Sequence, residues 1–144
     1  MSELLGKALE IAWAAHEGQK DKGGHPYIRH PLSVAGQLDT KEVIMTALLH
    51  DVAEDTDITI EEIEKEGFPP AVIEALKLLT HDPAVDYLDY VRQLGTNELA
   101  KRVKLADLWH NTRPERLGRE LTEKDRQRLE KYRKARAILT GEEE

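Results

Sequence analysis

Apolar residues recur along this chain at intervals of three and four, the spacing of a helix that buries one face. Near the N-terminus, Leu4, Ala8, Ile11 and Ala15 follow this spacing, with further apolar residues beside them. Aromatic residues make up only 5% of the chain, and long β-branched runs are few. These features predict an all-α protein.

Caps and breaks between the apolar segments predict where the helices begin and end. Thr40 can cap one helix, while Thr59-x-x-Glu62 and Thr122-x-x-Asp125 are typical of capping boxes that open two others. We expect helices over residues 4 to 15, 31 to 37, 40 to 53, 59 to 67, 69 or 70 to 79, 87 to 94, 96 or 97 to 111, and 122 to 139. No repeat, low-complexity stretch or linker interrupts them, so residues 1–144 are expected to form a single compact helical-bundle domain.

The net charge and the absence of cysteine argue against several classes of function and of site. The formal net charge of −7 argues against nucleic-acid binding, although a local basic patch can still hold a phosphorylated small molecule. A chain without cysteine has no disulfide framework and no thiolate zinc site. The N-terminal segment carries acids instead of an apolar leader, and no stretch is long enough to span a membrane. We therefore expect a cytoplasmic protein without a membrane partner.

The segment 46–59, TALLHDVAEDTDIT, turns abruptly from apolar to acidic. His50 and Asp51 can offer a ring nitrogen and a carboxylate oxygen to the same cation, and Glu54 falls on the same helical face. Asp55 follows directly. The segment is either an ordinary helix end with a polar cap or part of a metal site with its own acid and base.

A mononuclear site needs about four such donors, so further ligands must come from elsewhere in the chain. His30 follows a glycine-rich loop, and Asp107 interrupts an otherwise apolar helix face, with Asn111 one turn beyond it. Two neutral imidazoles and two carboxylates balance a divalent cation. This mixed set suits Mn²⁺, Fe²⁺ or Co²⁺ and leaves positions for water and a phosphate oxygen.

Three blocks of the sequence resemble a known family. They are AHEGQKDKGGHPYIRHPLSVA at 15–35, TALLHDVAEDT at 46–56 and RVKLADLWHN at 102–111. In this order they are similar to the H…HD…D signature of the HD-domain metal-dependent phosphohydrolases. Within that group they resemble the hydrolase domain of the RelA/SpoT family and the small alarmone hydrolases. The similarity extends from about Ala12 to Asn111.

The resemblance implies an all-α HD-type fold around one Mn²⁺. It implies hydrolysis of the 3′-diphosphate of guanosine tetra- and pentaphosphate, (p)ppGpp, with release of pyrophosphate. The metal ligands would then be His30, His50, Asp51 and Asp107. Glu54 and Asp55 would be the catalytic acids beside the attacking water, a role that suits carboxylates placed next to a cation.

The resemblance also implies a set of side chains that bind the nucleotide substrate. Lys22 would face the nucleotide, and Tyr27 would shape the loop around it. Asn111 would hold the substrate, although a helix C-cap is an equal alternative. Lys104, with Lys101, would attract phosphates or else belong to a solvated helix face.

The remaining candidates are interpreted as structural. His16, His81 and His110 are expected to be structural or surface residues. Four large aromatic residues are expected to pack in the core and not to stack on a base: Trp13, Tyr87, Tyr90 and Trp109. In the charged last helix, the stripe of Leu129, Tyr132 and Leu139 is expected to pack on the domain or on a second copy, which would make a homo-oligomer.

Two positions depart from the family pattern. Asp21 stands where the family carries an arginine that packs on guanine, and His25 stands where an acid is common. The first alternative function is therefore a phosphohydrolase for another nucleotide or phosphorylated metabolite. The second is a catalytically silent metal-binding module, against which the intact Glu54-Asp55 pair argues.

Overall fold

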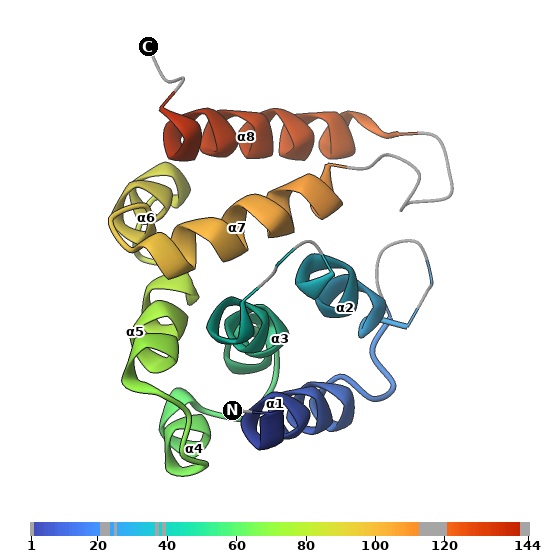
Figure 1. Ribbon diagram of the computed structural model, residues 1–144. Helices are drawn as coiled ribbons and strands as arrows, with labels where there is room; N and C mark the ends of the chain where they lie inside the picture. The colour runs from blue at the N-terminus through green and yellow to red at the C-terminus, as the bar shows by residue number, and fades with distance from the viewer. Residues whose placement is uncertain are drawn as a thin grey trace.

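The computed structural model describes residues 2–20, 24, 26–36, 38, 40–112 and 121–141, and Figure 1 shows the arrangement of their helices. The helices are α1 (Ser2–Ala15), α2 (Arg29–Ala35), α3 (Lys41–Asp55), α4 (Ile60–Lys65), α5 (Pro70–Leu79), α6 (Tyr87–Leu94), α7 (Glu98–Asn111) and α8 (Glu123–Thr140). Extended pairing within the described ranges is limited to one isolated bridge between Lys20 and Pro26. The predicted all-α class is confirmed.

Helix α3 lies at the centre of the fold. Figure 1 shows it between α1, α2, α5 and α7, and it packs against all four. Every residue from Met45 to Val52 is buried. A helix enclosed on several sides is apolar around most of its circumference, which explains the run of apolar residues before His50.

The core consists of two clusters of buried side chains that meet at α3. One cluster joins α3 to α1, α4 and α5 through Met45, Leu49, Ile63, Leu76 and their neighbours. The other joins α3 to α5, α6, α7 and α8. It includes Val43, Ala47, Leu79, Tyr90, Leu94, Val103, Leu108 and Leu139. The polar site described below is built on helices that belong to these clusters, so its side chains start from a rigid frame.

The predicted caps are present. The hydroxyl of Thr40 accepts a hydrogen bond from the backbone N–H of Val43, and both predicted capping boxes form, at Thr59 and at Thr122. Asn97, one of two candidates, caps α7. Caps of this kind satisfy backbone donors that have no partner within the helix.

Among the helix ends that differ from the sequence-based bounds, one end each of α2 and α3 bears on the site. Helix α2 begins two residues earlier than expected, because a proline in the first turn, here Pro31, removes no intrahelical hydrogen bond. Helix α3 continues to Asp55, where Thr56 bonds back to the carbonyl of Val52 through its N–H and its hydroxyl. Glu54 and Asp55 therefore lie on the last turn of α3 and not on a turn after it.

The two tryptophans do not pack in the core as expected. Trp13 is 54% exposed and Trp109 is 41% exposed. Each tryptophan directly follows a fully buried residue, Ala12 or Leu108. Successive residues of a helix are rotated by about 100°, so each tryptophan side chain points away from the buried face.

No helix within the described ranges combines the length and apolar character needed to cross a membrane.

We predict that Thr122→Ala lowers the free energy of unfolding by about 1 kcal/mol, the usual cost of losing an N-cap. Thr122 accepts from the N–H of Asp125, and the carboxylate of Asp125 accepts from the N–H of Thr122. Urea denaturation would measure the loss. Thr122→Ser keeps the hydroxyl and serves as the control, which should stay close to wild type. Equal stability of Thr122→Ala and wild type would contradict the role of the cap.

Candidate metal centre

Three helices bring four polar side chains to one point. His30 comes from α2, His50 and Asp51 come from α3, and Asp107 comes from the middle of α7. One ligand atom from each lies within 4.8 Å of the others. All four side chains are buried, and none is more than 6% exposed. Buried ionisable groups are costly unless they are paired or bind a cation.

The imidazole of His50 is oriented by its own helix. Its Nδ1 lies 2.6 Å from the carbonyl oxygen of Ala47, which can only accept, so Nδ1 carries the proton. The other nitrogen, Nε2, is buried and has no hydrogen-bond partner among the described residues. It lies 3.3 Å from Asp51 Oδ1 and 3.4 Å from Asp107 Oδ1. Nε2 thus points between two carboxylates.

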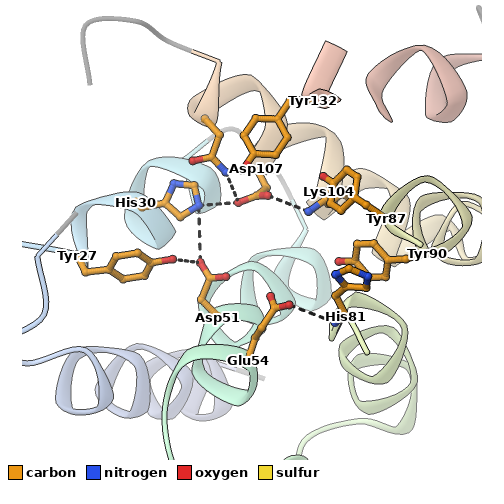
Figure 2. Close-up of a pocket in the computed structure, with 11 residues that line it drawn as sticks. Tyr27, His30, Asp51, Glu54, His81, Tyr87, Tyr90, Lys104, Asp107 and Tyr132 are labelled. Atoms are coloured by element: carbon orange, nitrogen blue, oxygen red, sulfur yellow. Dashed lines mark hydrogen bonds and ion pairs between the residues drawn. The ribbon is translucent and has the colours of Figure 1, made fainter. Parts of the chain in front are cut away.

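The imidazole of His30 meets the same carboxylates from the opposite helix. Its Nε2 lies 2.6 Å from Asp107 Oδ1 and 3.7 Å from Asp51 Oδ2, as the dashed lines in Figure 2 show. Its Nδ1 lies 2.6 Å from Nδ1 of His110, one turn after Asp107 on α7. Each histidine therefore turns Nε2 toward the cluster and has a partner at Nδ1.

The carboxylates are held by neighbours that the sequence suggested for substrate binding. The hydroxyl of Tyr27 donates to Asp51 Oδ2 at 2.8 Å. The amide of Asn111 donates to Asp107 Oδ1 at 3.3 Å, and Lys104 Nζ lies 3.4 Å from Asp107 Oδ2. These three side chains fix the carboxylates as well as facing the pocket. Lys22 lies outside the described residues.

The two carboxylates make the centre strongly attractive to positive charge. Burial lowers the pKa of His50, but Asp51 and Asp107 outweigh this effect and raise the pKa to about 9. Burial would raise the pKa of Asp107, yet the Lys104 ammonium and the imidazoles lower that pKa well below its usual range. The pKa of Lys104 is raised despite its burial, chiefly by Asp107. Asp107 therefore remains ionised.

The four side chains form a suitable donor set for a divalent metal. Two imidazole nitrogens and two carboxylate oxygens suit a metal of intermediate hardness, and the two negative charges balance a divalent cation. The unpartnered Nε2 of His50 supports this interpretation, because a buried polar atom without a partner is unfavourable unless something binds to it.

Glu54 and Asp55 lie beside this cluster at the end of α3. Glu54 faces the pocket, where its Oε1 accepts from the backbone N–H of His81 at 3.2 Å. Asp55 does not line the pocket, and its Oδ2 accepts from the Tyr27 hydroxyl at 3.3 Å. Both carboxyls reach solvent. Partial burial raises the pKa of each above its usual value, and the neighbouring Asp51 carboxylate adds to the effect.

A pocket of about 210 Å³ opens next to the cluster (Figure 2). Its walls are formed by Tyr27, His30, Asp51, Glu54, His81, Tyr87, Tyr90, Lys104, Asp107, Asn111 and Tyr132. Figure 2 shows Tyr27, His30 and Asp51 at one end, and Tyr87, Tyr90, His81 and Lys104 at the other. The pocket thus joins an end suited to a cation to an end that presents an ammonium group and aromatic rings.

Four of the residues that line the pocket were not predicted from the sequence. Tyr90 packs in the core as expected, but it also lines the pocket, as do Tyr87, Tyr132 and His81. Lys104 Nζ lies 5.5 and 5.4 Å from the ring centroids of Tyr87 and Tyr90. The one usable signal was the spacing of Tyr87 and Tyr90, which places both on one face of α6. Nothing in the sequence indicates that this face turns toward α7.

Comparison with known proteins identifies the family of the fold. The family model described as HD domain matches residues 8–138. A solved structure of a metazoan orthologue of SpoT, described as hydrolysing ppGpp, superposes with a TM-score of 0.77 at 29% identity. The match covers 98% of this chain and 88% of that one.

Relatives of known name match the same region. The guanosine-3′,5′-bis(diphosphate) 3′-pyrophosphohydrolase MESH1 of Danio rerio is 37% identical over 123 residues, which is 76% of this chain and 68% of that protein. A guanosine-3′,5′-bis(diphosphate) 3′-pyrophosphohydrolase of Aquifex aeolicus is 43% identical over 90 residues, 60% of this chain but only 13% of the longer relative. The chain therefore belongs to the HD-domain family, with relatives of the MESH1 and SpoT/RelA hydrolase type.

Proposed function

We propose that this protein is a metal-dependent hydrolase that removes the 3′-diphosphate of (p)ppGpp as pyrophosphate. One observation carries the proposal. Four buried ligand atoms converge within 4.8 Å beside a pocket, in a chain whose relatives include MESH1 of Danio rerio. The relatives supply the substrate class, and the side chains of this chain supply a centre suited to phosphoester hydrolysis.

We infer that His30, His50, Asp51 and Asp107 hold the metal and that Mn²⁺ is the cation best suited to them. A divalent cation at this centre supplies Lewis acidity, which lowers the pKa of a bound water and polarises a phosphoryl oxygen. The chain contributes the fixed geometry. The Nδ1 contacts of the two histidines and the donors to both carboxylates hold the four side chains in place.

Glu54 and Asp55 are the proposed groups that accept a proton from the attacking water and orient it. Their raised pKa values bring them closer to neutral pH, where a carboxylate is a more effective general base. Glu54 is the better placed of the two, because it faces the pocket and is fixed by the N–H of His81. The carboxylate of Asp55 accepts a hydrogen bond from the Tyr27 hydroxyl.

The other end of the pocket suits the phosphate groups of the substrate. Lys104 presents a permanently charged ammonium at the pocket wall, next to the tyrosine rings. Asn111 lines the same wall and is the proposed contact for the ribose. On a chain with a net charge of −7, local positive charge is needed to hold an anionic nucleotide.

A substrate panel tests the proposed activity. Protein stripped of metal and restored with Mn²⁺ is offered guanosine tetraphosphate beside other nucleoside di- and triphosphates, monophosphates and dinucleotides. We expect pyrophosphate and guanosine diphosphate from the tetraphosphate, identified by chromatography. Hydrolysis of a different member alone would contradict the alarmone substrate while retaining the metal centre. Inactivity on the whole panel with metal bound would contradict the hydrolase proposal.

We predict that Asp107→Ala loses most of its bound metal, because Asp107 Oδ1 lies between the Nε2 atoms of both histidines. Elemental analysis after dialysis, on protein shown to be folded by circular dichroism, would measure metal per chain. Asp57→Asn changes an exposed acid near the end of α3 and should retain metal as wild type does. Full metal content in Asp107→Ala would remove this residue from the ligand set.

We predict that Glu54→Gln and Asp55→Asn each lower kcat by about 10²- to 10⁴-fold, the usual contribution of general acid–base catalysis. Neither residue belongs to the cluster of four ligand atoms, so metal content should not change. Steady-state kinetics with guanosine tetraphosphate would measure the loss. Glu61→Gln changes an exposed acid on α4 and provides a matched control. Wild-type turnover by both variants would exclude these residues from catalysis.

A further inference from the structure

The contact between His30 and His110 joins the metal centre to a residue outside it. The two Nδ1 atoms lie 2.6 Å apart, the ring centroids lie 4.9 Å apart, and the ring planes differ by 18°. For two imidazoles whose Nδ1 atoms are 2.6 Å apart, a centroid separation of 4.9 Å is close to the largest possible. It is reached only when each nitrogen points almost directly at the other ring. The imidazoles are therefore nearly coplanar and lie end to end. An in-plane lone pair and an in-plane N–H favour this geometry for an N–H···N hydrogen bond.

Such a bond needs one donor and one acceptor, and the choice decides what His30 can bind. If His110 donates, Nδ1 of a neutral His30 accepts and its proton lies on Nε2, where it donates to Asp107 Oδ1 at 2.6 Å. If His30 donates from Nδ1, its Nε2 carries a lone pair toward the carboxylates. Only the second arrangement lets Nε2 bind a cation.

The two histidines of the centre have different acceptors for a hydrogen bond from Nδ1–H. His50 lies deep in α3 and finds an acceptor three residues earlier in its own helix, the carbonyl of Ala47. His30 is the second residue of α2, and the carbonyl three residues before it, on Tyr27, already accepts from the backbone N–H of His30 at 2.9 Å. Its acceptor must come from another element. His110 on α7 is in position, three residues after Asp107, so α7 supplies both a ligand and the partner of a ligand.

We propose that His110 is a positioning residue that accepts a hydrogen bond from Nδ1–H of His30. Its own proton lies on Nε2, so that Nδ1 is unprotonated and can accept from His30. The bond fixes the tautomer and the ring plane of His30 and directs Nε2 into the metal centre. Partners of this kind, which hold a ligand and do not touch the metal, contribute substantially to metal affinity. This inference rests on the proposed metal centre but not on the identity of the substrate.

Metal affinity of three variants tests the role of His110. Calorimetric titration with Mn²⁺ would give the dissociation constant of each stripped protein. His110→Phe keeps a flat ring and removes the acceptor, so we expect about 10- to 100-fold weaker binding. His110→Asn places an amide oxygen near the former Nδ1 and should restore most of the affinity. Trp109→Phe changes the neighbouring exposed ring and should bind as wild type does.

Two outcomes of this titration would overturn the proposal. Wild-type affinity in His110→Phe would show that the acceptor is not needed. Equal weakening in His110→Asn and His110→Phe would show that the shape of the histidine matters and not its acceptor. Thermal denaturation of each stripped variant serves as the control. A melting temperature equal to that of the wild type would show that the substitution affects the metal site and not the fold.

The tautomer of His110 in the wild-type protein gives a test that does not depend on a variant folding. Nitrogen-15 correlation spectra of the Zn²⁺-loaded protein would locate the ring protons, because Zn²⁺ is diamagnetic. We expect His110 to carry its proton on Nε2 with Nδ1 free, and His30 to carry its proton on Nδ1. A proton on Nδ1 of His110 would overturn the proposal.

These readouts are independent of hydrolysis. If the wild type binds Mn²⁺, His110→Phe binds it weakly and His110→Asn restores the affinity, the inference stands even when guanosine tetraphosphate is not a substrate. If the substrate panel succeeds but His110→Phe binds Mn²⁺ normally, only the inference fails. If the wild type binds no divalent metal, the metal centre and the role of His110 are both overturned.

Discussion

The site depends on one buried carboxylate in the middle of α7. Asp107 Oδ1 lies 2.6 Å from Nε2 of His30 and 3.4 Å from Nε2 of His50, while Oδ2 lies 3.4 Å from Lys104 Nζ. A charge in this position would destabilise an apolar core, but here each oxygen has a partner of positive or proton-donating character. The pairing ties α2, α3 and α7 together at the point where the chemistry is proposed to occur.

The position of α3 explains why its sequence changes so abruptly at His50. Its middle turns, from Met45 to Leu49, are enclosed by α1, α2, α5 and α7 and carry apolar side chains around most of the helix. Its last turns reach the edge of that packing, where Glu54 and Asp55 meet solvent. His50 and Asp51 lie at the boundary, still buried but next to the pocket. The same helix therefore provides core packing, two proposed ligands and two proposed catalytic acids in chain order.

Much of this arrangement could be predicted from the sequence because its causes are local. Capping at Thr40, Thr59 and Thr122 depends on residues three positions apart, and the structure contains all three caps. The grouping of the four proposed ligands was implied by resemblance to a family, and spacing alone left their partners open. The end of α3 was placed too early, because two hydrogen bonds from Thr56 to the carbonyl of Val52 extend the helix to Asp55.

Residues whose roles depend on the packing of distant helices could not be found in this way. Tyr87 and Tyr132 reach the pocket only because of the angles at which α6 packs against α5 and α8, and α8 against α7. Apolar periodicity does not specify such angles. His110 was expected to be structural or at the surface. Its contact with His30 spans 80 residues and becomes visible only once α2 and α7 are placed side by side.

Each polar side chain of the centre is held in place by a hydrogen-bond or ion-pair partner. The carbonyl of Ala47 fixes the proton of His50, Tyr27 occupies one oxygen of Asp51, and Lys104 occupies one oxygen of Asp107. One ligand atom from each of the four side chains lies within 4.8 Å of the others. A centre assembled in this way is preorganised, because little has to move when a cation binds. Rigid helices, and not the loops between them, therefore set the geometry of the proposed reaction.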